Sequence, residues 1–223
     1  MSDKTKRSNL KYNFDETMEL TSELCEFVGA VIGDGSLEKF PRTGRIHITG
    51  DRVLDKSYYL DHLSEISKLL FNISPKIYEK ENTLRLNIYS KKLFEMMHLR
   101  FTIPHGKKAY TVLIPDEILA SKKKFINSTI RGVFDTDGGV SFDKRKIYKQ
   151  PYIRLNHTSA SKGLIKQISR VLWSYCINHS IHKKDKTYMI QINGKRMVSS
   201  FVQKIGFSNK RHKDKIKKHF QNH

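Results

Sequence analysis

Two spacings of hydrophobic residues recur along the chain, and each predicts a different kind of element. Apolar residues three or four positions apart predict helices from Thr21 or Ser22 to Gly35 and at 53–71, 91–101, 121–137, 161–176 and 196–206. Alternating apolar and polar residues predict strands at 36–40, 45–50, 76–80, 83–89, 139–146, 150–157, 180–185 and 187–193. The pattern indicates an α+β fold of two pseudo-symmetric αββαββα halves, each an antiparallel sheet backed by helices.

The two halves form an internal repeat, because the offset between equivalent segments is nearly constant. Asp34 and Asp137 lie 103 positions apart, and TLRLNIYSKKL at 83–93 aligns with TYMIQINGKRM at 187–197 at an offset of 104. Residues 102–120 carry two of the five prolines and little periodicity, which is typical of a linker. We predict an N-terminal half at 1–101, a linker at 102–120, a C-terminal half at 121–207 and a basic tail at 208–223, helical on the second half or frayed.

The net charge of the chain indicates which class of partner it binds. Lys and Arg total 42 against 22 Asp and Glu, for a net charge of +20, which favours a nucleic acid over a membrane surface. No apolar run approaches a membrane span and the first residues lack a signal-peptide core, so we expect an intracellular protein of unknown host compartment. Cys25 and Cys176 are expected to be reduced and buried, and the ten histidines show no zinc-ligand pattern.

Two short segments, 24–37 and 130–139, carry the most specific signal. Each is an apolar run that ends in one acidic residue followed by glycine, at Asp34 and at Asp137. Small residues four positions apart would let two helices cross closely. These helix-interface residues are Gly29, Gly33, Gly132 and Thr136. The crossing would bring both carboxylates to one point, where they would repel each other without a cation between them, so we predict a metal site there.

Both segments resemble the LAGLIDADG motif of homing endonucleases, and the resemblance covers about residues 22–207. Phe27–Gly35 and Ile130–Gly138 stand where the nine motif residues stand. The first copy departs at its sixth position, where Ile32 replaces the usual aspartate, and the second copy keeps Asp135. The family's eighth-position acid is present in both copies. The resemblance implies a monomer whose two motif helices pack at the interface between the halves.

The resemblance also implies chemistry. Asp34 and Asp137 would bind Mg²⁺, helped by the backbone carbonyls of Gly33 and Thr136, and Mn²⁺ would substitute, whereas Ca²⁺ would support binding without efficient cleavage. The reaction would hydrolyse one phosphodiester in each strand of a long DNA target across the minor groove, leaving short 3′ overhangs. Family enzymes use a basic residue near each scissile phosphate. Lys195 and its repeat mate Lys91 are expected in that role.

Side chains that alternate with the apolar strand positions would face the DNA. They are rich in arginine, asparagine and glutamine, which suit contacts with base edges. The expected DNA-binding residues are Arg45, His47, Thr49, Lys76, Tyr78, Lys80, Arg85, Asn87, Tyr89, Arg154, Asn156, Gln191 and Asn193.

The first hypothesis is therefore an intron-type homing endonuclease. The alternative on the same scaffold is a non-cleaving nucleic-acid binder, either an RNA maturase for its own intron or a DNA-binding regulator. A basic structural protein is a third hypothesis, and the paired acids argue against it. The initial methionine and the lack of protein-splicing blocks favour a free-standing protein over an intein.

Overall fold

The computed structural model describes residues 14–148 and 150–221 and contains two four-stranded antiparallel sheets. The strand order is β1-β2-β4-β3 in the first sheet and β5-β6-β8-β7 in the second, so both halves share one topology. The α+β fold predicted from the pattern is confirmed. The strands are β1 Gly35–Lys39, β2 Gly44–Asp51, β3 Lys76–Lys80, β4 Thr83–Tyr89, β5 Gly138–Asp143, β6 Tyr152–Ser159, β7 His179–Lys184 and β8 Thr187–Asn193.

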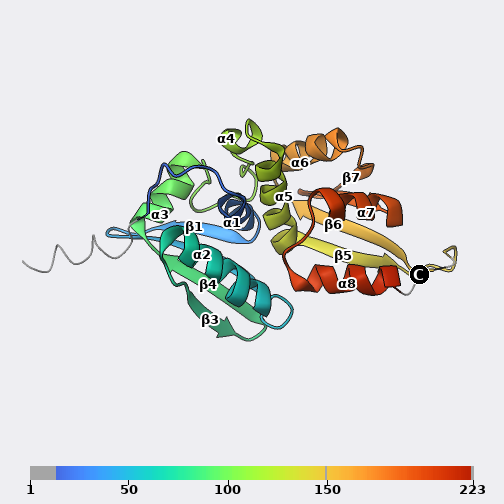
Figure 1. Cartoon of the computed structure of the whole chain (residues 1–223), viewed down its shortest axis with the longest axis horizontal. Helices are drawn as coiled ribbons and strands as arrows, with labels where there is room; N and C mark the ends of the chain where they lie inside the picture. Colours follow the sequence, from blue (N-terminus) through green and yellow to red (C-terminus); the bar gives the residue numbers. More distant parts are fainter. Residues whose placement is uncertain (1–13, 149, 222–223) are drawn as a thin grey trace, which may run out of the picture.

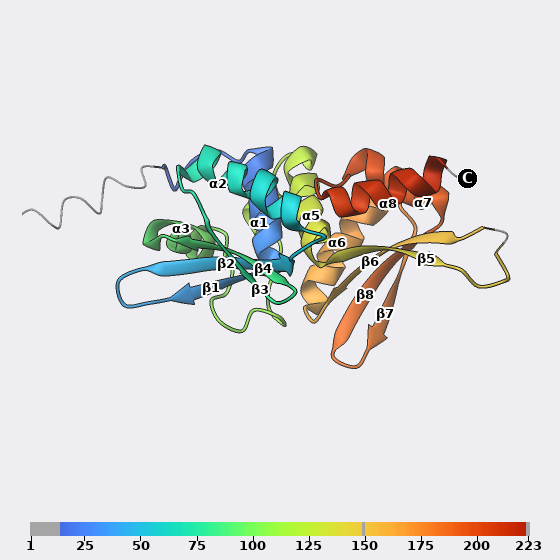
Figure 2. The ribbon, with the colours of Figure 1, turned by 90° about the horizontal axis from the view of Figure 1, so that it is seen from below.

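Helices cover one side of both sheets and leave the other side open (Figure 2). Two of the predicted helices contain a π-helical stretch, since η1 leads into α2 and α3 leads into η2. The helices are α1 Ser22–Ile32, η1 Tyr58–Leu63, α2 Ser64–Phe71, α3 Lys91–Glu95, η2 Met96–Arg100, α4 Asp116–Leu119, α5 Lys123–Asp137, α6 Lys162–Ser174, α7 Lys195–Lys204 and α8 Lys210–Gln221.

The two motif helices, α1 and α5, lie side by side between the halves (Figures 1 and 2). Their glycines allow the close approach. A Cβ atom on Gly29 would lie 2.1 Å from the carbonyl oxygen of Thr129, and one on Gly132 would lie 2.2 Å from that of Glu26. Because those neighbours are backbone atoms that cannot rotate away, any larger residue would force the helices apart.

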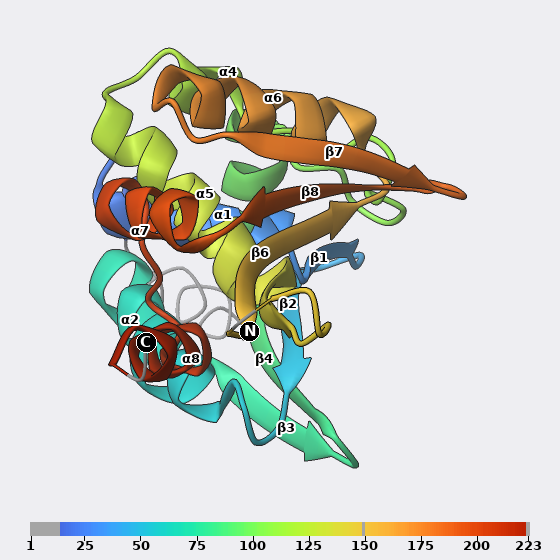
Figure 3. The ribbon, with the colours of Figure 1, turned by 90° about the vertical axis from the view of Figure 1, so that its right-hand side faces the viewer.

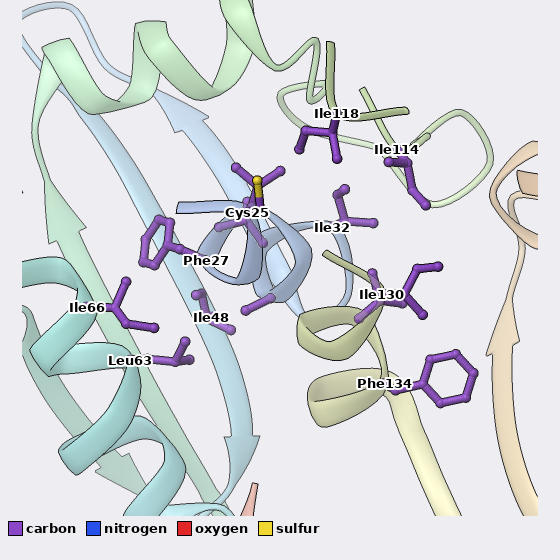
Figure 4. Close-up of a cluster of buried hydrophobic side chains, with 14 of the residues drawn as sticks. Cys25, Phe27, Ile32, Ile48, Leu63, Ile66, Ile114, Ile118, Ile130 and Phe134 are labelled. Carbon is purple, nitrogen blue, oxygen red and sulfur yellow. The ribbon is translucent and has the colours of Figure 1, made fainter. Parts of the chain in front are cut away.

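The hydrophobic core is continuous across the two halves, and α1 lies at its centre. Leu24 through Ile32 are all buried. Figure 4 shows Phe27 of α1 directed toward the helix that carries Leu63 and Ile66, and Phe134 of α5 directed away from α1 toward the second half. Burial of this apolar surface is the main force that holds the halves together, at about 25 cal/mol per Å².

The segment predicted as a linker is packed rather than loose. Ile114 and Ile118 are buried beside α1 (Figure 4). The backbone N–H of Ile114 donates to the side-chain oxygen of Gln167 at 2.8 Å, and the Gln167 amide donates back to the Ile114 carbonyl. The crossing chain is therefore fixed to α6 of the second half.

Three local predictions can be compared with the structure. Thr21 is the N-cap of α1, since its hydroxyl accepts from the backbone N–H of Leu24 at 3.1 Å. Cys25 is buried as expected, but Cys176 is exposed, because it lies beyond the end of α6 with a positive φ of 55°. The tail forms α8, which packs beside β5 and near α2 of the other half (Figures 1 and 3).

Candidate metal and nucleic-acid site

The two motif acids lie where the crossed helices reach the sheets. Asp34 follows the last turn of α1 and precedes β1, and Asp137 is the last residue of α5. Both are followed by a glycine that pairs with a central strand, Gly35 with Ile48 and Gly138 with His157. The internal repeat therefore brings the acids together at equivalent points of the two halves.

The surroundings of Asp34 disfavour the ionised form of its carboxyl group. Burial, together with repulsion from the neighbouring Asp137 carboxyl and a hydrogen bond with it, raises the pKa of Asp34 to about 8. Two carboxyl groups this close cannot both ionise without a compensating cation. The pair is thus suited to bind a divalent ion, which would neutralise both groups at once.

The segment 102–120, called the crossing segment below, carries a lysine, Lys108, to the acid pair. Its Nζ donates to the carbonyl oxygens of Val31, Ile32 and Gly33, with the Gly33 contact at 2.6 Å. Burial lowers the pKa of Lys108 to about 8, while the nearby Asp137 and Asp34 act in the opposite direction. Lys108 therefore holds the last turn of α1 and faces both acids.

Arg211 of α8 occupies the equivalent place in the second half. It lies 103 positions after Lys108, the same offset as between the motif acids. Its guanidinium forms an ion pair with Asp55 at 3.1 Å and donates to the carbonyl oxygen of Thr136 at 3.5 Å. A basic side chain thus lies at the end of each motif helix.

Asp135 has a structural partner that explains the difference between the two motif copies. Its carboxylate accepts from the backbone N–H groups of Ser208 and Asn209 at 2.8 and 3.0 Å, just before α8 begins. Burial raises the pKa of Asp135 to about 7, although these hydrogen bonds act in the opposite direction. In the first half, the range equivalent to α8 contains only the short helix α4, which begins at Asp116, so no helix begins at the place equivalent to Lys210, which is consistent with Ile32 at this position of the first copy.

Comparisons with known proteins support this fold. Residues 124–206 match the family described as LAGLIDADG-like domain. The chain carries a LAGLIDADG-like domain and shares the fold of the LAGLIDADG homing endonucleases. The homing endonuclease I-DmoI in complex with DNA and Ca superimposes with a TM-score of 0.62 at 19% identity, covering 89% of this chain and 98% of that chain. I-WcaI bound to its DNA recognition sequence gives 0.59 at 18% identity, covering 92% and 88%.

Curated relatives match over most of this chain. A probable translation initiation factor IF-2 of Thermococcus kodakarensis is 26% identical over 86% of this chain. A replication factor C small subunit of Methanocaldococcus jannaschii is 30% identical over 92%. The chain spans only 15% and 10% of these two proteins, so their names describe mainly what lies outside the matched segment.

No helix within 14–148 or 150–221 is long and apolar enough to cross a membrane.

The LAGLIDADG acids supply only part of a metal's ligand set. Within the described ranges, no three His, Cys, Asp or Glu side chains cluster closely enough to hold an ion by themselves. The carbonyl oxygens of Gly33 and Thr136, expected as further ligands, already accept from Lys108 and Arg211. Mg²⁺ is commonly bound by one or two carboxylates together with water and substrate phosphate, so the acid pair fits this ion.

The structure places Lys91 and Lys195 just after the last strand of each half and away from the LAGLIDADG acids, and their role beside the scissile phosphates stays a prediction. Lys91 begins the helix that follows β4, and Lys195 begins the helix that follows β8. The acids lie near the opposite ends of these two strands. Lys91 forms an exposed ion pair with Glu95, and Lys195 lies over the ring of Phe220. A simpler signal identifies the nearby cations, since Lys108 and Arg211 both follow the motif acid of their half by 74 positions.

The strand register agrees with the predicted faces of both sheets. The strand positions expected to face inward are buried at Ile46, Ile48, Leu84, Leu86, Ile88, Ile153, Leu155, Ile190 and Ile192, and Tyr188 is partly exposed. Asn87 is the outward residue with the least exposure, at 5%. A groove on the open side of the first sheet is lined by Arg45, Tyr78, Glu79, Lys80, Thr83, Arg85, Asn87 and Tyr89. The other residues expected to bind DNA also lie on strands, namely His47, Thr49, Lys76, Arg154, Asn156, Gln191 and Asn193.

Proposed function

We propose that this chain is a site-specific DNA endonuclease of the intron-homing type that depends on a divalent metal. It binds a long duplex through the open sides of its two sheets and hydrolyses one phosphodiester in each strand across the minor groove, leaving short 3′ overhangs. The observation that carries the proposal is the pairing of Asp34 and Asp137, whose carboxyl groups meet at the junction of the two sheets.

The acid pair would bind the divalent metal ion. A divalent ion held there by Asp34 and Asp137 would polarise the scissile phosphate and lower the pKa of a bound water. Asp34 and Asp137 would position the ion, with Mg²⁺ as the physiological choice, Mn²⁺ as a substitute and Ca²⁺ as a binding-only ion. Structures of I-DmoI with DNA and Mn and with target DNA in the presence of Mg support this choice of ions.

Lys108 and Arg211 would act on the phosphates rather than on the metal. Each holds the last carbonyls of a motif helix and therefore has a fixed position beside the acids. A fixed cation stabilises the negative charge that develops on a phosphate during hydrolysis. We propose these two residues in the role first expected of Lys91 and Lys195.

The remaining surfaces suit a single chain bound to duplex DNA. The net charge of +20 favours contact with many phosphates, and the halves already provide two related sheets. We propose a monomer whose N-terminal half, crossing segment and C-terminal half have the boundaries predicted from the sequence. Its own intron RNA remains a possible second ligand.

Substitution of either acid tests the proposal most directly. Asp34→Asn and Asp137→Asn should each abolish double-strand cleavage in Mg²⁺ and leave DNA affinity in Ca²⁺ within a few fold of the original protein. Asp214→Asn, on the exposed side of α8, is the matched control and should cleave normally. Full cleavage by either motif variant would overturn the metal assignment. DNA binding without cleavage by the unaltered protein would favour the maturase or regulator.

A further inference from the structure

An arginine held by a carboxylate occurs at matched places on the open sides of the two sheets. Arg45 of β2 donates to Glu38 at 2.5 Å, and Arg154 of β6 donates to Asp143 at 2.6 Å. Their side chains are 29% and 23% exposed, so both remain accessible. The two carboxylates differ in position, since Glu38 lies directly across from Arg45, whereas Asp143 lies two residues beyond Ser141, the residue across from Arg154.

The strand register makes the two arginines equivalent. Arg45 lies three residues before Ile48, the partner of the first motif glycine. Arg154 lies three residues before His157, the partner of the second motif glycine. At about 3.3 Å per residue, both arginines lie at the same distance along their strands from the acid pair.

Each guanidinium is held in place but not fully used within the protein. Arg45 lies over the rings of Phe40 and Tyr89, and Arg154 lies over that of Tyr152. Within the described part of the chain, the Nε atom of each arginine is buried without a hydrogen-bond partner, so only the terminal N–H groups of the guanidinium can reach a ligand. An arginine has five N–H donors, so each one retains donors for a ligand after it has bound its carboxylate.

The carboxylate beside each arginine favours contact with a DNA base over contact with a phosphate. Glu38 and Asp143 neutralise their arginines and would repel a phosphate placed against the pair. The major-groove edge of guanine carries no net charge and offers two acceptors, O6 and N7, which match a bidentate arginine. A fixed side chain also loses less conformational freedom on binding than a free one.

We propose that Arg45 and Arg154 read one guanine each, at positions equally distant from the centre of the target and on opposite strands, and that Glu38 and Asp143 are positioning residues for them. This inference rests on the proposed DNA binding. It also predicts where the two half-sites diverge. The next outward residue toward the centre is His47 in β2 but Asn156 in β6, so the half-sites should agree at the arginine position and differ beside it.

Selection from a randomised duplex library tests the inference without any need for cleavage. Bound DNA is recovered in Ca²⁺ and sequenced, and guanine should be enriched at two mirror-related positions. Arg45→Ala should remove the preference in one half-site, by about 5- to 150-fold in relative affinity, and Arg154→Ala should remove it in the other. Glu38→Gln should weaken the preference at the Arg45 position alone while the melting temperature is retained.

Arg145→Ala is the matched control. Arg145 also pairs with Asp143, at 2.7 Å, but lies outside the central strand, so its removal should leave the base preferences unchanged. A uniform loss of affinity for all sequences in Arg45→Ala would mean a phosphate contact and would overturn the inference. Specific sites without mirror-related guanines would overturn it while the proposed function stands. No selected DNA at all would overturn both.

Discussion

At the end of α1 the neighbouring cation is Lys108, whereas at the end of α5 it is Arg211. The two residues lie at equivalent places, but they differ in chemistry. Lysine can lose its proton when it is buried, and burial lowers the pKa of Lys108 to about 8. Arginine stays charged at any ordinary pH. The two halves of the site are therefore alike in geometry and unlike in their response to pH.

Replacing either cation with an uncharged residue should have the largest effect on cleavage. Lys108→Met and Arg211→Met should each slow cleavage by about 10²- to 10³-fold, the usual cost of removing a group that stabilises a transition state. If each cation serves one strand, each variant should accumulate DNA nicked in a different strand. Gel analysis of differently labelled strands measures this. Equal slowing of both strands by both variants would contradict separate roles.

The reciprocal exchange provides the control. Lys108→Arg and Arg211→Lys keep a positive charge in each half, so both should retain most of the activity. Thermal melting of all four variants shows whether the loss of carbonyl contacts has unfolded the protein instead.

The helix crossing offers the next largest effect, because it joins the two halves. Gly29→Leu should lower the free energy of unfolding by at least about 1–3 kcal/mol, since the new side chain would meet the Thr129 carbonyl. Gly139→Ala is the matched control, because a Cβ atom there has no neighbour within 4 Å. Denaturant unfolding of both variants measures the difference. An unchanged midpoint for Gly29→Leu would show that the helices do not cross at that residue.

The pH dependence of stability sharpens the contrast further. Folding raises the pKa of Asp34 to about 8 and that of Asp135 to about 7, so both acids bind protons more tightly in the folded state. Stability from this source is fully present below pH 3.8 and is lost as the pH rises to about 8. Lys108 acts in the opposite direction between about pH 8 and 10.5. Metal-free protein should therefore become less stable from pH 6.5 to 8.

The contribution of Asp34 can be isolated by difference. Melting temperatures of the unaltered protein and of Asp34→Asn should converge near pH 4, and the variant should become relatively more stable as the pH approaches 8. Added Mg²⁺ should stabilise the unaltered protein above pH 7 much more than the variant. Parallel pH profiles for the two proteins would contradict the raised pKa of Asp34.

The smallest expected effect compares the tips of the two sheets. Lys80 ends β3 and Lys184 ends β7, at the repeat offset of 104. If each contacts one phosphate, Lys80→Ala and Lys184→Ala should each reduce the slope of log affinity against log salt by about 1 and leave base preference unchanged. Filter binding across a salt series measures the slopes. Altered base preference would instead indicate direct contact with bases.

The sequence predicted most of the fold because its pattern is local. The bounds of β3 and β4 agree with the structure, since alternation in those strands directly reflects which side is buried. The pairing of Asp34 with Asp137 was also expected, from the repeat. Local patterns could not locate Lys108, whose role depends on a segment that returns to the end of α1 after 74 residues.

Two other features depended on contacts between distant residues. Asp135 looked like one more motif acid, but it binds the backbone N–H groups of Ser208 and Asn209. The role of Lys91 and Lys195 stays a prediction, because the strand pairing puts the ends of β4 and β8 that they follow away from the acids. Periodicity reveals which side of a strand is buried, but it does not reveal which end faces a site.

The position of Arg211 in the chain has a consequence for synthesis. Asn209 donates to Asp55 at 2.7 Å, and Arg211 pairs with the same carboxylate, so residues more than 150 positions apart fix the relative orientation of the halves. A ribosome adds these residues after both motif helices have been made. A growing chain could therefore fold its first sheet early, but it would complete the charged cluster only as translation reaches α8. Until α8 has been made, the site that we propose for DNA cleavage would lack Arg211.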